Sequence, residues 1–116
     1  MPELPEVETV RRGLIPMLAG RRIVRLQQRR KDLRVPMPKN FAGRVEGRTV
    51  TSIDRRAKYL LIRLDDGQTL IVHLGMSGRM VLHDEKSAAE HPLGKHDHVV
   101  IDTDQGWQVR FNDARR

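Results

Sequence analysis

The spacing of hydrophobic residues changes at about residue 20, and this change constrains the fold more than any other feature of the chain. Before it, apolar residues recur every three or four positions, whereas after it apolar and polar residues alternate in short runs. A period of two is typical of strands with one buried face, and the earlier spacing is typical of an amphipathic helix. The sequence therefore predicts one helix followed by a mainly β fold.

The first segment, residues 3 to about 18, has the spacing of a helix that buries one face. Gly20 follows it and is the residue type that most often ends a helix. Glu8 and Arg12 stand four positions apart, so we expect their side chains to pair across one turn. Pro16 lacks an N–H and disfavours the helical conformation of the residue before it, so we expect it to kink the helix or end it early.

The rest of the chain consists of short alternating runs separated by turn residues. We expect strands at residues 22–29, 48–54, 58–64, 69–74, 79–82, 97–102 and 107–111. Asp66-Gly67 and Asp104-Gln105-Gly106 are the clearest turns, and the polar residues 83–95 are expected to form a mobile loop. Strands at this spacing, joined mostly by short turns, predict an antiparallel β-sandwich or barrel with the N-terminal α-helix packed against it.

Composition limits the classes of protein to consider. A chain of 116 residues with 38% hydrophobic residues is expected to form one domain with a core of its own. It contains no cysteine, which excludes disulfides, a thiolate zinc site and a cysteine nucleophile within these residues. The first twenty residues contain charges and no long apolar run, so we expect no secretory signal, no membrane span and a cytoplasmic location.

Positive charge is concentrated in one short segment. The formal net charge is +7, and residues 21–34 alone hold seven Lys and Arg against one Asp. Such a concentration is expected of a protein that neutralises DNA phosphates, and we count Arg34 among the DNA-binding candidates. A solvated basic strand is the alternative. Only four aromatic residues are present, too few for stacking along a single strand, so double-stranded DNA is the expected partner.

Motifs of ordinary hydrolases are absent from the sequence, which leaves the N-terminus as the place for chemistry. Removal of Met1 would leave Pro2 with a free secondary amine, which is partly uncharged near neutral pH and nucleophilic. Its attack on a sugar aldehyde carbon gives an iminium that cannot lose its charge by shedding an N–H proton, and Glu3 could serve as acid or base. The alternative is structural, because Pro2, Glu3 and Glu6 all suit the first turn of a helix.

Five motifs in order along the chain resemble the formamidopyrimidine-DNA glycosylase (Fpg) family. They are PELPEVETVRRGL at residues 2–14, RRAKYLL at 55–61, HLGMSGR at 73–79, KHDHV at 95–99 and RFNDARR at 110–116. The resemblance implies a bifunctional enzyme that removes oxidised purines from DNA, such as 8-oxoguanine and formamidopyrimidines, and then nicks the abasic strand by β/δ-elimination. Leu4 favours this branch over the related endonuclease VIII branch, which usually has Gly there and prefers oxidised pyrimidines.

The resemblance also implies roles for single residues. Pro2 would be the Schiff-base nucleophile on the deoxyribose C1′, Glu3 its acid/base partner, and Glu6 a support for the first turn. Lys58 matches the lysine that serves β-elimination. It also opens an apolar run, where partial burial would disfavour the charged amine. A strand-end lysine that reaches solvent is the alternative.

Further positions would contact DNA. His73 and His96 resemble residues that contact phosphates. Without the motif, His96 and His98 would be suspected of binding a metal on one strand face, but no third ligand is indicated. Met76 would fill the space left by an extruded base, and Arg115 would reach the orphaned cytosine. The alternatives are that Met76 fills the core and that Arg115 is one more basic residue at a terminus.

The resemblance covers only the N-terminal catalytic domain of the family, here residues 1–116. The family's helix-two-turn-helix region and zinc finger follow that domain, so we expect no metal or other cofactor in these residues and a zinc ion only in the full-length family. We expect a monomer. A non-catalytic basic β-domain that only binds nucleic acid is the rival function, and retention of Met1 would favour it.

Overall fold

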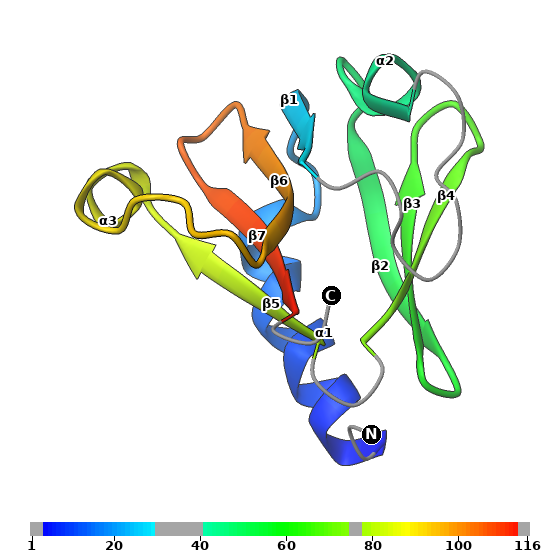
Figure 1. Ribbon diagram of the computed structural model, residues 1–116. Coiled ribbons are helices and arrows are strands. Elements are labelled where there is room, and N and C mark those ends of the chain that lie inside the picture. Colours follow the sequence, from blue (N-terminus) through cyan, green and yellow to red (C-terminus); the bar gives the residue numbers. More distant parts are fainter. Residues whose placement is uncertain (1–3, 30–40, 75–77, 114–116) are drawn as a thin grey trace.

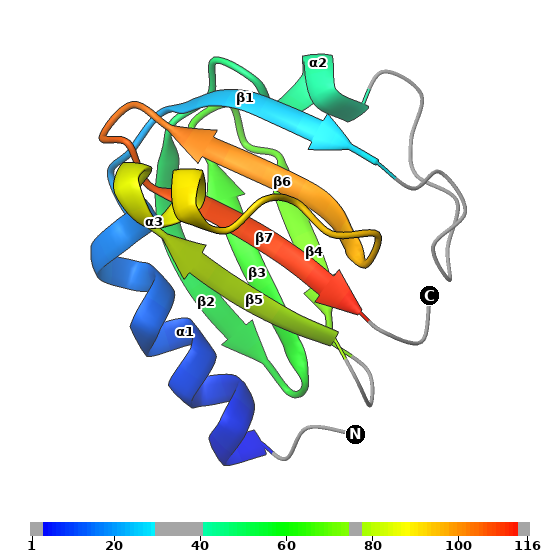
Figure 2. The same ribbon diagram turned by 60° about the vertical axis from the view of Figure 1, so that its left-hand side comes forward.

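The computed structural model describes residues 4–29, 41–74 and 78–113, which form two facing sheets with a helix along one side (Figures 1 and 2). In chain order the elements are α1 (Leu4–Leu18), β1 (Ile23–Gln28), α2 (Phe41–Val45), β2 (Val50–Arg56), β3 (Tyr59–Leu64), β4 (Thr69–His73), β5 (Gly78–His83), α3 (Glu85–Glu90), β6 (Asp97–Thr103) and β7 (Gln108–Asp113).

The two sheets confirm the predicted antiparallel sandwich. One has the strand order β1-β6-β7-β5 and the other the order β2-β3-β4, and every pairing is antiparallel. All seven predicted strands are present, with ends that differ from the prediction by at most two residues. Alternation of apolar and polar residues was therefore sufficient to locate each strand, because each sheet has one face turned towards the core.

α1 confirms the predicted helix, but Pro16 does not end it early. Val7, Leu14 and Leu18 are each 1% exposed and form the face of α1 that is buried in the core. Pro16 lies in the last turn, and the helix continues through it to Leu18. Burial of the leucines on either side holds this turn in helical conformation despite the missing N–H. Gly20 follows with a φ of 79°, as expected of a residue that ends a helix.

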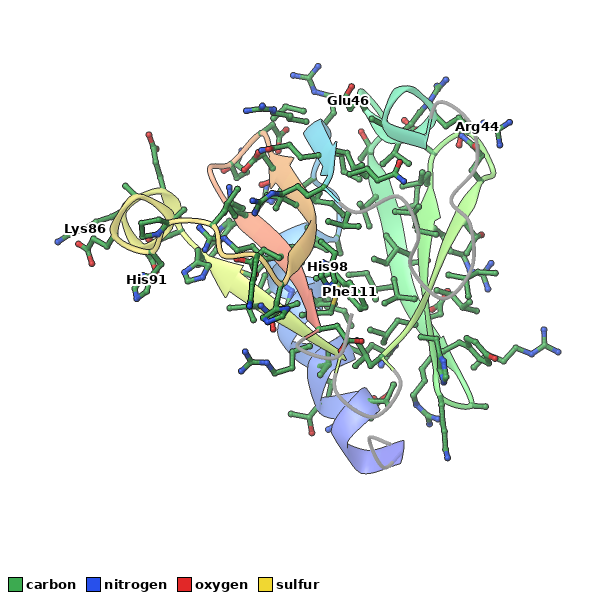
Figure 3. The ribbon with its side chains drawn as sticks, viewed as in Figure 1. Arg44, Glu46, Lys86, His91, His98 and Phe111 are labelled. Carbon is green, nitrogen blue, oxygen red and sulfur yellow. The ribbon has the colours of Figure 1, made fainter. Side chains whose placement is uncertain are left out.

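The hydrophobic core lies between the two sheets and extends to α1. Its buried side chains are Val7, Leu14, Leu18, Ile23, Leu26, Val45, Val50, Ile53, Leu60, Ile62, Leu64, Val99, Ile101 and Val109. Phe111 packs against this cluster, and Figure 3 shows it between the sheets together with His98.

The predicted loop at residues 83–95 is wrong over its first half, because α3 occupies Glu85–Glu90. The carboxylate of Asp84 caps this helix by accepting the N–H of Ser87 at 2.7 Å. α3 lies over the outer face of the four-stranded sheet (Figure 2), where the buried Arg110 side chain donates to the carbonyl of Ala88 at 3.3 Å. α2 was not predicted either.

Both predicted turns are confirmed. Gly67 lies in the turn that joins β3 to β4 and has a φ of 89°, and Gly106 lies in the turn that joins β6 to β7 and has a φ of 81°. These values fall in the left-handed region, which glycine adopts without steric cost, so the turn residues define where each hairpin reverses.

Candidate functional site

Several strand ends meet at one edge of the sandwich, which we call the site edge. It comprises the β2–β3 turn at Ala57-Lys58, the end of β4, the start of β5, the end of β7 and the start of β6. Strand pairing brings them together, because Tyr59 pairs with His73 in one sheet and Gly78 with Asp113 in the other. Figure 2 shows the beginning of α1 below the β2–β3 turn and the start of β5, with the end of β7 and then the start of β6 farther from it along the edge.

Five predicted site residues lie outside the described residues, namely Pro2, Glu3, Arg34, Met76 and Arg115. The described residues next to three of these segments belong to the first turn of α1, the connection between β4 and β5, and the end of β7. The start of β5 and the end of β7 belong to the site edge, and Figure 2 shows the first turn of α1 on the same side of the molecule as the β2–β3 turn. Glu6 lies in the first turn of α1, as predicted.

The three-stranded sheet brings Lys58 and His73 to the site edge. Lys58 is half-buried, as predicted from its place at the start of an apolar run. It follows Ala57, whose φ of 53° is unusual for a residue with a side chain. His73 is the last residue of β4, and the centroid of its ring lies 4.9 Å from that of Tyr59. The two candidates thus lie on adjacent strand ends: Tyr59 follows Lys58 in the sequence and pairs with His73 across the sheet.

His96 lies just before β6, and its environment does not support a metal site with His98. The ring of His98 is 1% exposed, and its Nε2 atom is 2.9 Å from the carbonyl oxygen of Asp113. The two histidine rings are perpendicular, with centroids 6.2 Å apart, and a bulge interrupts β6 between Asp97 and Val99. They therefore do not share a strand face. The backbone carbonyl of His96 accepts the N–H of Asp113 at 3.1 Å.

Asp97 organises this part of the site edge, although nothing in the sequence indicated this role. Its carboxylate accepts the N–H of Gly94 at 2.8 Å and the side-chain amide of Asn112 at 2.9 Å. Burial by itself would raise the pKa of the Asp97 carboxyl. The hydrogen bonds from Asn112 and Gly94, with the nearby charges of Arg110 and Arg29, nevertheless hold this pKa below its usual value. The ionised carboxylate therefore fixes the backbone on both sides of His96.

Glu8 links α1 to the β2–β3 turn. The predicted pair with Arg12 is confirmed at 3.0 Å, but Arg11 at 2.9 Å and Arg55 at 3.1 Å bind the same carboxylate. The hydrogen bond from Arg55 is the main reason why the pKa of Glu8 is lowered; burial opposes it, and Arg12 and Arg11 reinforce it. Helical spacing indicated the pairing partners within α1, whereas nothing in the sequence indicated Arg55, which is 47 residues away.

The basic segment is distributed along β1 rather than gathered at one place. Within its described part, Arg22, Arg25 and Arg29 are exposed. β1 runs antiparallel to β6, so only its C-terminal end reaches the site edge. There Arg29 donates its backbone N–H to the carbonyl of His98 at 2.7 Å and its Nη1 atom to the carbonyl of Gly94 at 3.1 Å. Of the described arginines in the basic segment, Arg29 is therefore the one at the site edge.

Neither a metal centre nor a membrane helix is found in the part of the chain that the structure describes. Among these residues, no group of three or more His, Asp or Glu side chains is placed to hold a metal ion, and the sequence has no cysteine. None of the described helices is both long and apolar enough to cross a membrane.

Comparison with known proteins places the chain in a family. The family model described as the formamidopyrimidine-DNA glycosylase N-terminal domain matches residues 1–116. Formamidopyrimidine-DNA glycosylases from Jannaschia sp. (strain CCS1) and Dinoroseobacter shibae are 56% and 55% identical to it, and each alignment includes the entire chain. The chain spans 42% and 43% of the length of these relatives.

Solved structures of Fpg also match the chain. The crystal structure of Lactococcus lactis Fpg bound non-covalently to DNA with an abasic site matches 98% of the chain with a TM-score of 0.84 and 33% identity. The complex of the same enzyme with DNA that contains FAPY-dG matches 97% with a TM-score of 0.83. The chain covers 42% and 41% of those two proteins. From its fold, its motifs and these matches, the chain belongs to the formamidopyrimidine-DNA glycosylase family.

Proposed function

We propose that the chain provides the reacting residues of a DNA-repair glycosylase that removes oxidised purines from double-stranded DNA and then cuts the abasic strand. Its relatives are named formamidopyrimidine-DNA glycosylases, and the matching structures of the Lactococcus lactis enzyme hold DNA with an abasic site or FAPY-dG. Identity of more than half over the entire chain supports the transfer of this activity.

The observation that carries the proposal is the convergence at the site edge. Lys58, His73 and His96 come from separate strand ends and lie on this one edge. The first turn of α1, which follows Pro2 and Glu3 in the sequence, is tied to the same place through Glu8 and Arg55. The segments that carry or adjoin the proposed reacting residues are far apart in the sequence and lie close together in the fold, which supports the proposal.

The proposed reaction begins with the amine of Pro2 after removal of Met1. Its nitrogen bonds to C1′ of the damaged nucleotide while the bond from C1′ to the base breaks. Glu3 gives a proton to the sugar-ring oxygen as the bond from C1′ to that oxygen breaks and the lone pair of the Pro2 nitrogen forms a double bond to C1′. The N–H proton of Pro2 passes through solvent to the departing base. The product is a cationic iminium between the protein and an opened sugar.

The iminium then makes strand cleavage easier. Lys58 takes a proton from C2′, and the iminium accepts the electron pair of that C–H bond to become an enamine. The enamine electrons then form a double bond between C2′ and C3′ and break the bond from C3′ to the 3′ phosphate, which leaves. His73 and His96 would hold phosphates of the same strand. Arg29 and Arg34 would add the sequence-independent attraction that phosphate neutralisation provides, and Arg115 would reach the cytosine that loses its partner when the damaged base is extruded.

Covalent trapping tests this assignment. The natural full-length protein is incubated with borohydride and a duplex that holds 8-oxoguanine opposite cytosine. We expect an irreversible adduct at Pro2, identified by peptide mass spectrometry, and no adduct from a matched sample that retains Met1. Glu3→Gln should bind the duplex normally but release the base much more slowly, because the substitution keeps the shape and removes the proton donor.

Two results would overturn the assignment. An adduct at Lys58 instead of Pro2 would give the nucleophilic role to the lysine. Binding of the duplex without any adduct or base release would favour the rival function, a basic β-domain that only binds nucleic acid.

A further inference from the structure

The carboxylate of Glu8 is the centre of a charged network between α1 and the three-stranded sheet. Its Oε1 atom accepts Arg55 Nε at 3.1 Å, and its Oε2 atom accepts Arg11 Nη1 at 2.9 Å and Arg12 Nε at 3.0 Å. Arg11 in turn donates its Nε to the carbonyl of Ile53 in β2 at 2.9 Å. Of the three arginines that share this carboxylate, Arg11 and Arg55 connect α1 to β2 at separate points.

Arg55 extends this network into the turn that carries Lys58. While its Nε atom binds Glu8, its Nη1 atom donates to the carbonyl of Ala57 at 3.1 Å. Ala57 occupies the first position of a two-residue hairpin turn with a φ of 53°, where glycine is the favoured residue. The guanidinium therefore holds in place a backbone conformation that an alanine rarely adopts without outside support.

From this arrangement we infer that Glu8 is a positioning residue for the strand-cutting step, because it fixes the Ala57-Lys58 turn relative to the helix that begins beside Pro2 and Glu3. The inference rests on the proposed function, which assigns the amine to Pro2 and the proton transfer to Lys58. Lys58 lies in the turn, whereas Pro2 precedes α1 in the sequence. The distance between the Pro2 amine and Lys58 therefore depends on the contacts between α1 and the turn. Small displacements of reacting groups reduce rates strongly.

A second ion pair on the same strand provides a contrast. Asp54 in β2 binds Arg63 in β3 at 2.8 Å, and both side chains are more than 40% exposed. This pair joins two strands that are already hydrogen-bonded to each other. The hydrogen bond from Arg63 lowers the pKa of Asp54 more than the charge of Arg11 in α1 does, so we expect loss of the pair to change the relation between α1 and the turn little. Asp54→Asn is therefore a matched control, since it also neutralises a carboxylate that is paired with an arginine.

The test uses the natural full-length protein and a duplex with a preformed abasic site. We expect Glu8→Gln to lower kcat for strand cutting about tenfold, with KM within twofold of the wild type and with the borohydride adduct still formed at Pro2. Asp54→Asn should retain the wild-type kcat. Amide hydrogen exchange at residues 57–59 should become faster in Glu8→Gln and remain unchanged in Asp54→Asn.

Arg55→Lys is the second variant, and it decides the question if Glu8→Gln fails to fold. A lysine keeps the charge beside Glu8, but its single ammonium group cannot reproduce the fork that binds Glu8 and the Ala57 carbonyl together. We expect the same loss of kcat. Wild-type cutting rates in the folded Glu8 and Arg55 variants, with the adduct at Pro2 present, would overturn the inference and leave the proposed function standing. A wild-type protein that forms no adduct would overturn both.

Discussion

Two glycine-to-alanine substitutions should change stability in opposite directions. An ideal Cβ at Gly78 would lie 2.2 Å from the carbonyl oxygen of Leu74, which belongs to the backbone and cannot rotate away. The same carbonyl accepts the N–H of Gly78 at 2.7 Å. At Gly13, an exposed position in α1, an added Cβ meets no atom within 4 Å. Both changes restrict the unfolded chain equally, so comparison of the two isolates the clash.

The magnitudes follow from these contacts. Relief of the clash at Gly78 requires a backbone shift of roughly 1 Å, with an overpacking cost of about 1–3 kcal/mol and loss of a hydrogen bond that contributes about 1 kcal/mol. Gly78→Ala should therefore destabilise by about 2–4 kcal/mol, whereas Gly13→Ala should stabilise by about 1 kcal/mol. For a chain of this length these values correspond to a Tm lowered by about 8–16 °C and one raised by about 4 °C.

Thermal unfolding of the 116-residue chain, followed by circular dichroism, measures both values. A Gly78→Ala protein with the wild-type Tm would refute the reasoning, because it would show that the connection from β4 to β5 yields without cost. A Gly13→Ala protein with a lowered Tm would show that α1 makes a contact at this position that the described structure lacks.

Three further predictions concern the stability of the chain. Leu60→Ala, at a position that is 0% exposed, should cost about 2–5 kcal/mol of unfolding free energy in urea titrations, and a cost below 1 kcal/mol would contradict its central place in the core. The folded-state pKa of Asp97 is lowered, so its carboxylate contributes fully to stability above the ordinary aspartate pKa of about 3.9, and this contribution is lost as the pH falls through the folded-state pKa. The unfolding free energy of Asp97→Asn should therefore depend less steeply on pH in this acid range. An unchanged dependence on pH would count against a stabilising role of the carboxylate. Ala57→Gly should raise stability by about 0.5–1 kcal/mol, since it relieves a left-handed residue that costs about 1–2 kcal/mol at the expense of a more flexible unfolded chain; a lowered urea midpoint would show that the turn is not strained.

The strands could be predicted because their alternation reflects burial on one face, which is a local property of the sequence. The failures have a different physical origin. Pro16 disfavours helix locally, but burial of Leu14 and Leu18 outweighs it. α3 was missed because its only apolar residues are the small Ala88 and Ala89 and no side chain in it is buried, although Asp84 and Ser87 have the spacing of a cap.

The candidate site could be predicted only where motifs identified residues one by one. Lys58, His73 and His96 were found in this way, and the structure places them on one edge. The residues that hold this edge in shape, Asp97 and Arg55, were not found. Their partners are separated from them by up to 47 residues in sequence, and hydrogen bonds of that range depend on the fold and have no periodicity that a sequence reveals.

The pairing of β1 with β6 determines when the site edge can form during synthesis. Ile23 pairs with Thr103 and Gln28 with Val99, whereas β2, β3 and β4 pair only within residues 50–73. Pairing β1 with β6 closes a much longer loop, which costs more entropy than pairing neighbouring strands. We therefore expect the three-stranded sheet to form first as the chain leaves the ribosome. Ile23 at the start of β1 can bond to Gly47 and Arg48, but the rest of β1 has no strand partner until β6 is made. A nascent chain that stops before residue 99 would therefore carry Pro2 and Lys58 but lack the second sheet that completes the edge around them.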